Sequence, residues 1–298
     1  MKSNISVVTC TMDRHDQLKK SIGEIKKLKN IEEQLIIDWN SKEELKKSFL
    51  DKNNKKIKIY RVKNEKKWWL TRAYNIGFYL SKGDYILKID ADVIIDFEKF
   101  NNLDYEKYDL VVFFDKPSDP GNFLIKKSLL RNINGFNEYM WEWGWSDNDL
   151  INRAKLFSTK IKYLDTSNFI KKIEHDNSSR TKVDVNKKYK DIKLFYYSLI
   201  KAYNDTNAFL AKKNLWSNKQ KFNYIIKDNL IKVNHFYNLK DLNAITKIQY
   251  RFVFVNSFFK IYMQKFRFRK RLVTFLLFLL PEKILEKHFS LYLYPKNN

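Results

Sequence analysis

The amino-acid sequence predicts an α/β fold with a mostly parallel sheet and helices on both faces. In the first half of the chain, short runs of Ile, Val and Leu alternate with segments whose apolar residues recur at helical spacing. This alternation is typical of parallel sheets, because each crossover helix packs back onto a sheet face. Only six glycines and four prolines occur in 298 residues, so few flexible linkers are expected.

Each element follows from its own residue pattern. The predicted strands are short apolar runs at residues 5–11, 34–38, 57–62 and 84–90. The predicted helices lie between them, at residues 15–28, 41–50 and 68–81. The first helix carries four apolar residues at helical spacing: Leu18, Ile22, Ile25 and Leu28. Ser41 is suited to cap the second helix, with two glutamates favourable in its first turn.

The character of the chain changes after about residue 180. Long helical segments rich in Lys, Asn and Tyr follow, and aromatic and basic residues interleave between residues 251 and 280. We therefore expect one α/β domain at residues 1–185 and a basic, mainly helical region at residues 186–298.

The chain is strongly basic. Its 58 Lys and Arg residues against 34 Asp and Glu give a formal net charge of +24. This excess favours phosphate-bearing partners such as nucleic acid, an anionic membrane or a nucleotide substrate. A general bias toward Lys, Asn and Ile explains it about as well.

The sequence also points to a compartment. Cys10 is the single cysteine and lies in an apolar run, which indicates a reducing, cytoplasmic setting. The first residues read as a strand and lack the pattern of a signal peptide. The longest apolar run, residues 272–280, has nine residues, against the roughly 20 that a membrane-spanning helix needs. No segment is therefore expected to cross a membrane.

Asp90 ends the fourth predicted strand, and a second carboxylate, Asp92, follows after Ala91. In parallel sheets ligands bind beyond the carboxyl ends of the strands. Carboxylate oxygens suit Mg²⁺ or Mn²⁺, which would also bind a substrate diphosphate. Asp is common where a strand leads into a turn, so this pattern alone leaves a structural role open.

His175 lies in a polar stretch, KKIEHDNSSR. A neutral imidazole is a ligand that Mn²⁺ accepts. By itself the pattern fits a surface histidine at least as well.

Three tryptophans precede two carboxylates in the stretch WEWGWSDNDL, residues 141–150. Ser146 is a good N-cap, and Asp147 is favourable in the first turn of a helix, so a structural role explains the acids. It does not explain the tryptophans. Indole faces beside a carboxylate suit a sugar, although packing in a core explains the aromatic cluster about as well.

In their order, these features resemble a known family. TCTMDR at the first strand is followed by IIDWNS, TRAYNIGFYLSKGDYILKIDADV and INGFNEYMWEWGWSDNDLINRA, and then by the histidine-containing loop. The combination resembles nucleotide-sugar glycosyltransferases of the GT-A fold that are similar to family 2. It is most similar to the branch of the β-1,4-galactosyltransferases and chondroitin-type polymerases. The resemblance covers roughly residues 3 to 180.

The resemblance implies a Rossmann-like GT-A catalytic domain and roles for individual residues. Asp147 would be the catalytic base, and Asp92 and His175 would bind Mn²⁺ or Mg²⁺. The nucleotide-sugar would contact Thr9, Thr11, Arg14, Asp38, Asn40, Arg72, Asp90 and Ala91. The acceptor would contact Trp143, Gly144, Trp145 and Asp149. Ser146 and Asn148 differ from the family pattern, which usually has Glu in place of Ser146, and this leaves the acceptor open.

The implied reaction is inverting transfer of a hexose or N-acetylhexosamine from a UDP-sugar to a hydroxyl of a glycan or lipid-linked glycan. The basic region around residues 251–280 would contact the inner face of an anionic membrane. A dimer or packing surface is its simpler explanation. No nucleic-acid motif accompanies it, so no nucleic-acid partner is expected. Two alternatives stay open, a basic nucleic-acid-binding protein and a non-catalytic glycan-binding protein.

Overall fold

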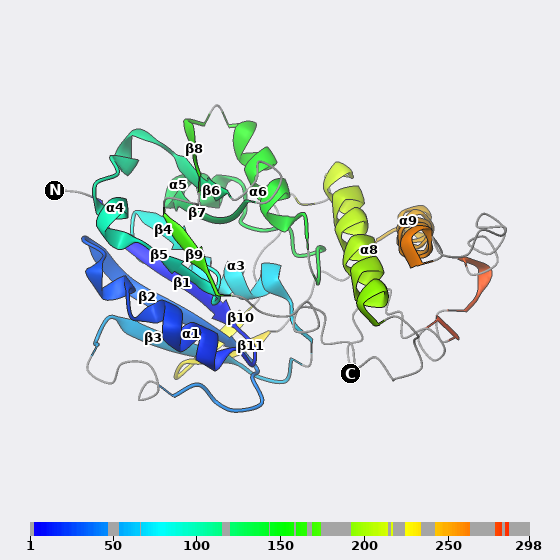
Figure 1. The fold of residues 1–298 in the computed structure, drawn as a ribbon, viewed down its shortest axis with the longest axis horizontal. Coiled ribbons are helices and arrows are strands. Elements are labelled where there is room, and N and C mark those ends of the chain that lie inside the picture. Colours follow the sequence, from blue (N-terminus) through cyan, green and yellow to red (C-terminus); the bar gives the residue numbers. More distant parts are fainter. Residues whose placement is uncertain are drawn as a thin grey trace. The chain divides into compact units, whose positions relative to one another are not determined.

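The computed structural model describes residues 3–46, 54–65, 67–114, 120–142, 144–157, 159–165, 169–173, 192–213, 216, 224–233, 242–262, 278–281 and 284–285. The chain divides into two compact units (Figure 1). The first comprises Met1–Asn137, Asp147–Glu174 and Trp216–Phe236, and the second comprises Glu138–Ser146, His175–Leu215 and Tyr237–Asn298. The two units interleave in the sequence. The single boundary near residue 185 stays a prediction.

The first unit is built on a mixed, mostly parallel sheet. Its strands are β1 (Ile5–Thr11), β2 (Ile31–Trp39), β3 (Ile57–Val62), β4 (Tyr85–Lys88), β6 (Leu110–Phe114), β7 (Pro120–Lys126), β8 (Ile161–Asp165), β10 (Tyr224–Lys227) and β11 (Leu230–Val233). They lie in the order β10-β11-β3-β2-β1-β4-β7-β6-β8 (Figure 1). Pairing is parallel from β11 to β4 and between β6 and β8, and β7 and β10 run antiparallel to their neighbours. The predicted α/β class is confirmed.

Helices cover both faces of this sheet. The helices of this part of the chain are α1 (His15–Ile22), α3 (Leu70–Leu80), α4 (Phe97–Asn101), α5 (Lys127–Asn132) and α6 (Ser146–Lys155). Ile5 and Val7 of β1 share a core cluster with Leu18 of α1. Val8 lies on the opposite face by strand alternation and meets α3 at Gly77. A Cβ atom at Gly77 would overlap the Val8 side chain, so glycine lets α3 approach the sheet.

Two predicted helices differ from the observed ones. The first ends at Ile22 and continues, after Gly23, as the short 3₁₀ helix η1 (Ile25–Lys27). Residues 41–46 form no helix, and residues 47–50 lie outside the described residues. The hydroxyl of Ser41 accepts a hydrogen bond from the backbone N–H of Asp13 instead of capping a helix. Tertiary contacts thus override the local signal.

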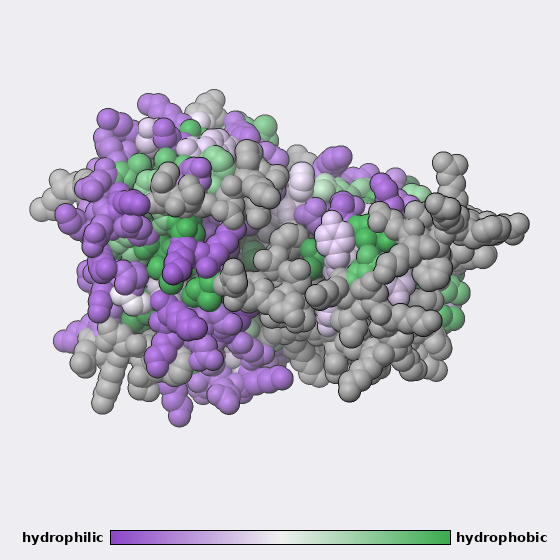
Figure 2. All heavy atoms as spheres, in the orientation of Figure 1, coloured by the Kyte–Doolittle hydropathy of each residue, from purple (hydrophilic) through white to green (hydrophobic). Residues whose placement is uncertain are grey.

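Smaller elements complete the first unit. A separate two-stranded sheet pairs β5 (Val93–Ile95) with β9 (Ile170–Lys172). A second 3₁₀ helix, η2 (Tyr105–Lys107), precedes β6. Hydrophilic side chains cover much of the face of this unit that Figure 2 shows. The core cluster lies between the sheet and its helices, with residues from β1 and α1 among its members.

The second unit contains two long helices, α8 (Ile192–Lys212) and α9 (Ala244–Tyr262), which lie side by side (Figure 1). Aromatic rings join them: Phe195 lies 5.4 Å from Phe258 and Tyr203 lies 5.3 Å from Phe254, between ring centroids. The part of the chain after residue 185 also supplies β10 and β11 to the first unit's sheet. A basic, mainly helical region therefore stays a prediction for residues 186–298. None of the helices in the described part of the chain has the length and apolar character needed to cross a membrane.

Candidate active site

The carboxyl ends of β1, β2 and β4 lie at one edge of the sheet. Thr11 at the end of β1 pairs with Asp38 of β2, and Lys88 at the end of β4 pairs with Val8 of β1. The hydroxyls of Thr9 and Thr11 are buried and have no hydrogen-bond partner among the described residues. Buried polar groups normally have partners, so both hydroxyls fit a ligand at this edge.

Asp38 is buried at the end of β2 in an ion pair. Its Oδ2 atom lies 2.6 Å from Nη1 of Arg61 on β3. Its Oδ1 atom accepts a hydrogen bond of 3.0 Å from the backbone N–H of Ser41, whose carbonyl accepts one from Arg61. These bonds fix the turn after β2. Arg61 is not among the predicted site residues, because it lies in no recognisable motif.

Asn40 and Arg72 reach the same corner of the site from different elements. Asn40 adopts the left-handed conformation, with φ of 52°, and its side-chain amide donates to the carbonyl of Glu65. The Arg72 guanidinium is buried on α3 and lies 3.3 Å from the ring centroid of Trp69. Burial raises the pKa of Glu65 to about 7, although the charge of Arg72 acts to lower it. A carboxyl that titrates near neutral pH thus lies beside the predicted nucleotide site.

Asp90 follows β4 and is held from three sides. Its backbone N–H donates to the side-chain oxygen of Asn122 on β7, at 2.8 Å. Its Oδ1 atom lies 2.9 Å from the hydroxyl of Tyr74, and the same Oδ1 lies 2.9 Å from Nζ of Lys88. Burial and then the charge of Asp90 raise the pKa of Tyr74, so its hydroxyl stays protonated and donates. Ala91, the next residue, is buried.

Lys88 contacts two predicted site residues but is not itself among the predicted ones. It is buried at the end of β4, and its ammonium contacts Oδ1 of Asp90 at 2.9 Å and Oδ1 of Asp147 at 3.3 Å. It also donates to the carbonyl of Gly121. Burial acts to lower the pKa of Lys88, but the carboxylates of Asp147 and Asp90 together have the larger effect and raise it above its usual value. The side chain is therefore a charged ammonium. The sequence feature that could have marked Lys88 as a site residue is its place within an apolar strand, where a lysine is unusual.

Asp92, two residues after Asp90, has a different partner. Its Oδ2 atom is 3.2 Å from Nη1 of Arg14, so two of the predicted site residues do come together. His175, the other predicted metal ligand, lies outside the described residues. Within the described part of the chain, no three His, Cys, Asp or Glu side chains form a group that could hold a metal ion.

Asp147 lies in the first turn of α6, where the helix dipole favours a carboxylate. Asp149, in the same turn, is buried and its Oδ2 atom is bound by Nε of Arg153 at 2.9 Å. Burial raises the pKa of Asp149, and Arg153 acts to lower it. The two acids of this turn thus have different partners: Asp147 pairs with Lys88, and Asp149 pairs within its own helix.

The tryptophan segment is a tightly bent loop in the second unit. Trp141 is buried, and its indole N–H donates to the hydroxyl of Tyr250 at 3.1 Å, so it is a core residue. Gly144 has φ of 102°, and a Cβ atom there would overlap Asn204 of α8. Trp145 also has a positive φ, 62°, and is half-buried. Trp143 lies outside the described residues.

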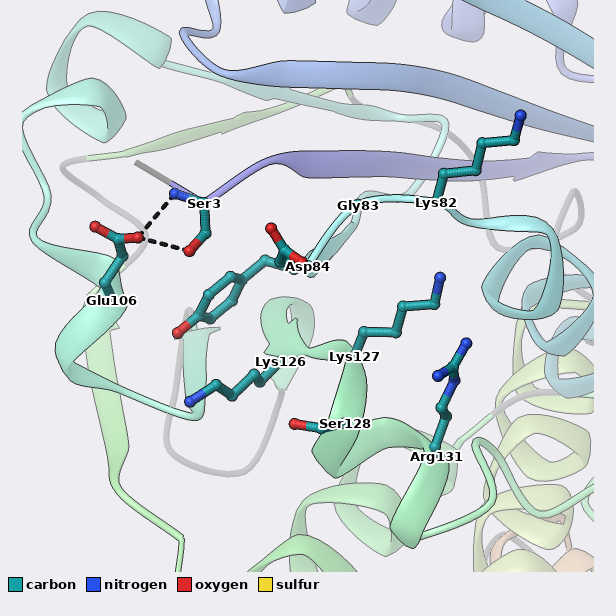
Figure 3. Close-up of a pocket in the computed structure, with 10 residues that line it drawn as sticks. Ser3, Lys82, Gly83, Asp84, Glu106, Lys126, Lys127, Ser128 and Arg131 are labelled. Atoms are coloured by element: carbon teal, nitrogen blue, oxygen red, sulfur yellow. Dashed lines mark hydrogen bonds between the residues drawn. The ribbon is translucent and has the colours of Figure 1, made fainter. Parts of the chain in front are cut away.

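A separate cavity of about 640 Å³ opens at the opposite edge of the sheet, where β1 and β4 begin. It is lined by Ser3, Lys82, Gly83, Asp84, Tyr85, Glu106, Lys126, Lys127, Ser128 and Arg131. In Figure 3 the charged ends of Lys82, Lys127 and Arg131 lie on one side of it, and Glu106 binds Ser3 on the other. No predicted site residue lines this cavity.

A mostly parallel sheet with an Asp-x-Asp motif at its carboxyl edge is the arrangement expected of a GT-A glycosyltransferase. Comparison with protein families gives the same answer. The model of the family described as glycosyl transferase family 2 matches residues 6–162, more than half of the chain. The chain therefore belongs to glycosyl transferase family 2 and is a glycosyltransferase. The family resemblance seen in the sequence is thereby confirmed.

Solved structures support the fold. The S. aureus TarS 1–349 structure has a TM-score of 0.50 and 13% identity, and the match covers 85% of this chain and 80% of that chain. The same protein in complex with UDP-GlcNAc has a TM-score of 0.51 and 12% identity, with 94% and 82% covered. At these identities the likeness concerns the fold alone. A search of curated proteins found no match.

Proposed function

We propose that this glycosyltransferase moves a hexose or N-acetylhexosamine from a UDP-sugar to a hydroxyl of a glycan, with inversion at the anomeric carbon. One observation carries the proposal. Asp147, the expected base, and Asp90, at the expected donor edge, both contact the ammonium of Lys88. Residues 57 positions apart are thus held at one point, where a donor and an acceptor would have to meet.

The donor would bind along the carboxyl edge of the sheet. The unpaired hydroxyls of Thr9 and Thr11, the Asp38–Arg61 pair and the Asn40 turn offer polar groups for uridine and ribose. Arg72 carries a positive charge beside this corner. The remaining proposed donor-binding residues are Asp90, Ala91 and Arg14, near the end of β4, where the diphosphate of the donor would lie.

A divalent cation, Mn²⁺ or Mg²⁺, would be held by Asp92 together with His175. The donor chemistry fits, because carboxylate oxygens and a neutral imidazole suit Mn²⁺, and a substrate diphosphate would supply further oxygens. When bound, such an ion neutralises the charge that develops on the leaving diphosphate. Nη1 of Arg14 lies 3.2 Å from Oδ2 of Asp92. The Arg14 guanidinium would therefore add a second positive charge, from the protein itself, near the leaving diphosphate.

Asp147 would take the proton from the acceptor hydroxyl as that hydroxyl attacks the sugar. Trp145, Gly144 and Trp143 are proposed to contact the acceptor, as the family resemblance implies, and Asp149 would order the start of α6 through Arg153. The acceptor proposed is a growing surface glycan or a lipid-linked glycan. Ser146 stands where the family usually has Glu, a residue that holds the acceptor sugar, so this position does not identify the acceptor sugar.

The test is UDP release from a panel of UDP-sugars, with Mn²⁺ and with EDTA, first without and then with candidate glycan acceptors. Slow hydrolysis of one donor that depends on Mn²⁺ is expected, because water replaces the acceptor. Absence of both UDP release and UDP binding for every donor would contradict the proposal. Glycan binding without UDP binding would favour the non-catalytic alternative.

We also propose that the enzyme works in the cytoplasm at the inner membrane face. The observation that favours this is a row of exposed apolar residues on α9, at Ile245, Ile248 and Phe252, in a chain of net charge +24. A basic chain with an apolar helix face fits an anionic lipid surface. Ile245→Ser with Ile248→Ser should weaken binding to phosphatidylserine vesicles in a flotation assay. Equal binding by wild type and variant would contradict it.

A further inference from the structure

Lys88 is a buried cation in a strand that otherwise consists of apolar residues. An ammonium has three N–H donors. Here three acceptors surround it, one each from Asp90 after β4, Asp147 of α6 and Gly121 of β7. The ring of Tyr74 on α3 lies 4.8 Å from Nζ and closes another side. Every donor of this group is thus directed to a fixed partner.

We propose that Lys88 is a positioning residue that locks the base Asp147 to the donor carboxylate Asp90. This inference rests on the proposed function of Asp147. Asp147 sits on a helix that begins directly after the bent tryptophan loop, so its side chain needs a fixed partner to stay aligned with a donor. Lys88 can supply one, because it lies on β4, whose backbone pairs with β1 on one side and with β7 on the other.

The arrangement also changes the expected role of Asp90. An ion pair at 2.9 Å and a hydrogen bond from Tyr74 already engage its Oδ1 atom. Asp90 therefore acts first as the anchor of Lys88, while Asp92, which pairs with Arg14, is the carboxylate proposed to hold a cation. Asp90 and Asp92 thus have different proposed roles because they pair with different residues, Lys88 and Arg14.

A purely structural role is the alternative, because removing one partner of a buried ion pair destabilises a protein whatever its function. Lys58 on β3 offers a matched control. Its Nζ atom lies 2.6 Å from the buried carboxylate of Glu33 in the same sheet, away from the proposed active site. Lys58→Met and Lys88→Met both remove a lysine from a sheet ion pair, and only Lys88→Met removes the partner of Asp147.

The experiment compares wild type, Lys88→Met and Lys58→Met by kcat, KM for the donor, the dissociation constant of UDP and the melting temperature. Displacing a base by about 1 Å costs roughly 100-fold in rate. Lys88→Met should therefore lower kcat about 100-fold while UDP binding changes less than about threefold. Lys58→Met should lower the melting temperature and leave kcat within about twofold of wild type.

A double variant makes the test specific. If Lys88 acts through Asp147, Lys88→Met added to Asp147→Asn should slow transfer no further, because both changes remove the same function. Folded Lys88→Met with kcat within threefold of wild type would overturn the inference, and so would strictly additive effects. Should Lys88→Met fail to fold, Lys88→Gln, which keeps two N–H donors without the charge, is expected to lower kcat about tenfold, and wild-type kcat would overturn the inference equally.

Failure of the proposed function would look different. In that case the wild type itself would release no UDP from any donor. The Lys88–Asp147 bridge would then be judged by melting temperatures alone: the double variant should be no less stable than the less stable single variant, since either change breaks the same pair. Additive losses of stability would show that the two side chains are not coupled.

Discussion

Asp147 combines three properties at the residue scale: a place in the first turn of α6, partial burial, and contact with a buried ammonium. As the proposed base it needs a free lone pair in the acceptor complex, and amidation removes its basicity with almost no change in shape. We predict that Asp147→Asn lowers kcat at least about 1000-fold. UDP affinity, measured by calorimetry, should stay within about threefold.

The control for this substitution is Asp96→Asn. Asp96 caps α4 by accepting from the backbone N–H of Lys99, away from the proposed site. The Asp96→Asn variant is expected to keep its turnover and nearly all of its stability, because asparagine caps a helix about as well as aspartate does. Near-normal turnover of Asp147→Asn would show that another group takes the proton.

Glu65 gives a prediction about pH. Burial raises its pKa from the usual 4.5 to about 7. Between these values the folded state binds more protons than the unfolded state, so stability falls as pH rises from about 4.5 to 7 and then levels off. Glu65→Gln removes this dependence. Because Glu65 is partly exposed, we expect the variant to gain only about 1–2 kcal/mol on wild type between pH 5 and pH 8, measured by thermal melting.

The control is Glu98→Gln, at an exposed position on α4. The stability of this variant should depend on pH in the same way as that of the wild type across the same range. If the gap between Glu65→Gln and wild type does not widen as the pH rises, Glu65 is not the group that titrates.

At the scale of elements, the bent loop before α6 depends on glycine. Gly144 has φ of 102°, and a side chain there would meet Asn204. Gly144→Ala should cost about 1–3 kcal/mol from backbone strain alone, seen as a lower melting temperature. Because Trp145 follows directly, KM for the acceptor should also rise.

Gly23→Ala is the matched control at this scale. Gly23 has φ of −57°, and a Cβ atom there would meet nothing within 4 Å. The substitution should be neutral or stabilise by about 0.5–1 kcal/mol, because alanine favours the helical conformation that Gly23 already adopts. A Gly144→Ala variant as stable as Gly23→Ala would mean that the loop relaxes without cost.

At the scale of the whole molecule, the proposed cation links the donor to the sheet edge. Removing divalent ions with EDTA should abolish transfer, and Mn²⁺ should restore it. Asp92→Ala should raise the Mn²⁺ concentration needed for half-maximal rate at least tenfold, since it loses a charged ligand. Full activity in EDTA would rule out the cation's part in the reaction without touching the family assignment.

Much of this architecture is local information and could be predicted. Strand residues such as ISVVTCT and YILKID specify buried strands, and alternation with helices specifies a parallel sheet whose carboxyl edge carries polar residues. Residues 41–50 show the limit, because Ser41 binds Asp13 instead of capping a helix. Trp141 shows it again: a sugar platform and a core residue look alike in sequence, and its contact with Tyr250 makes it core.

The sequence by itself determined the fold class, the family resemblance and the strand ends at which ligands are expected, because each depends on residues close together in the chain. Only the tertiary structure decided which charges meet. Lys88 and Asp147 belong to separate elements, and Asp92 finds Arg14 across the edge of the sheet. An ion pair forms wherever folding brings two oppositely charged side chains within a few ångströms of each other. Their separation along the chain does not determine that distance.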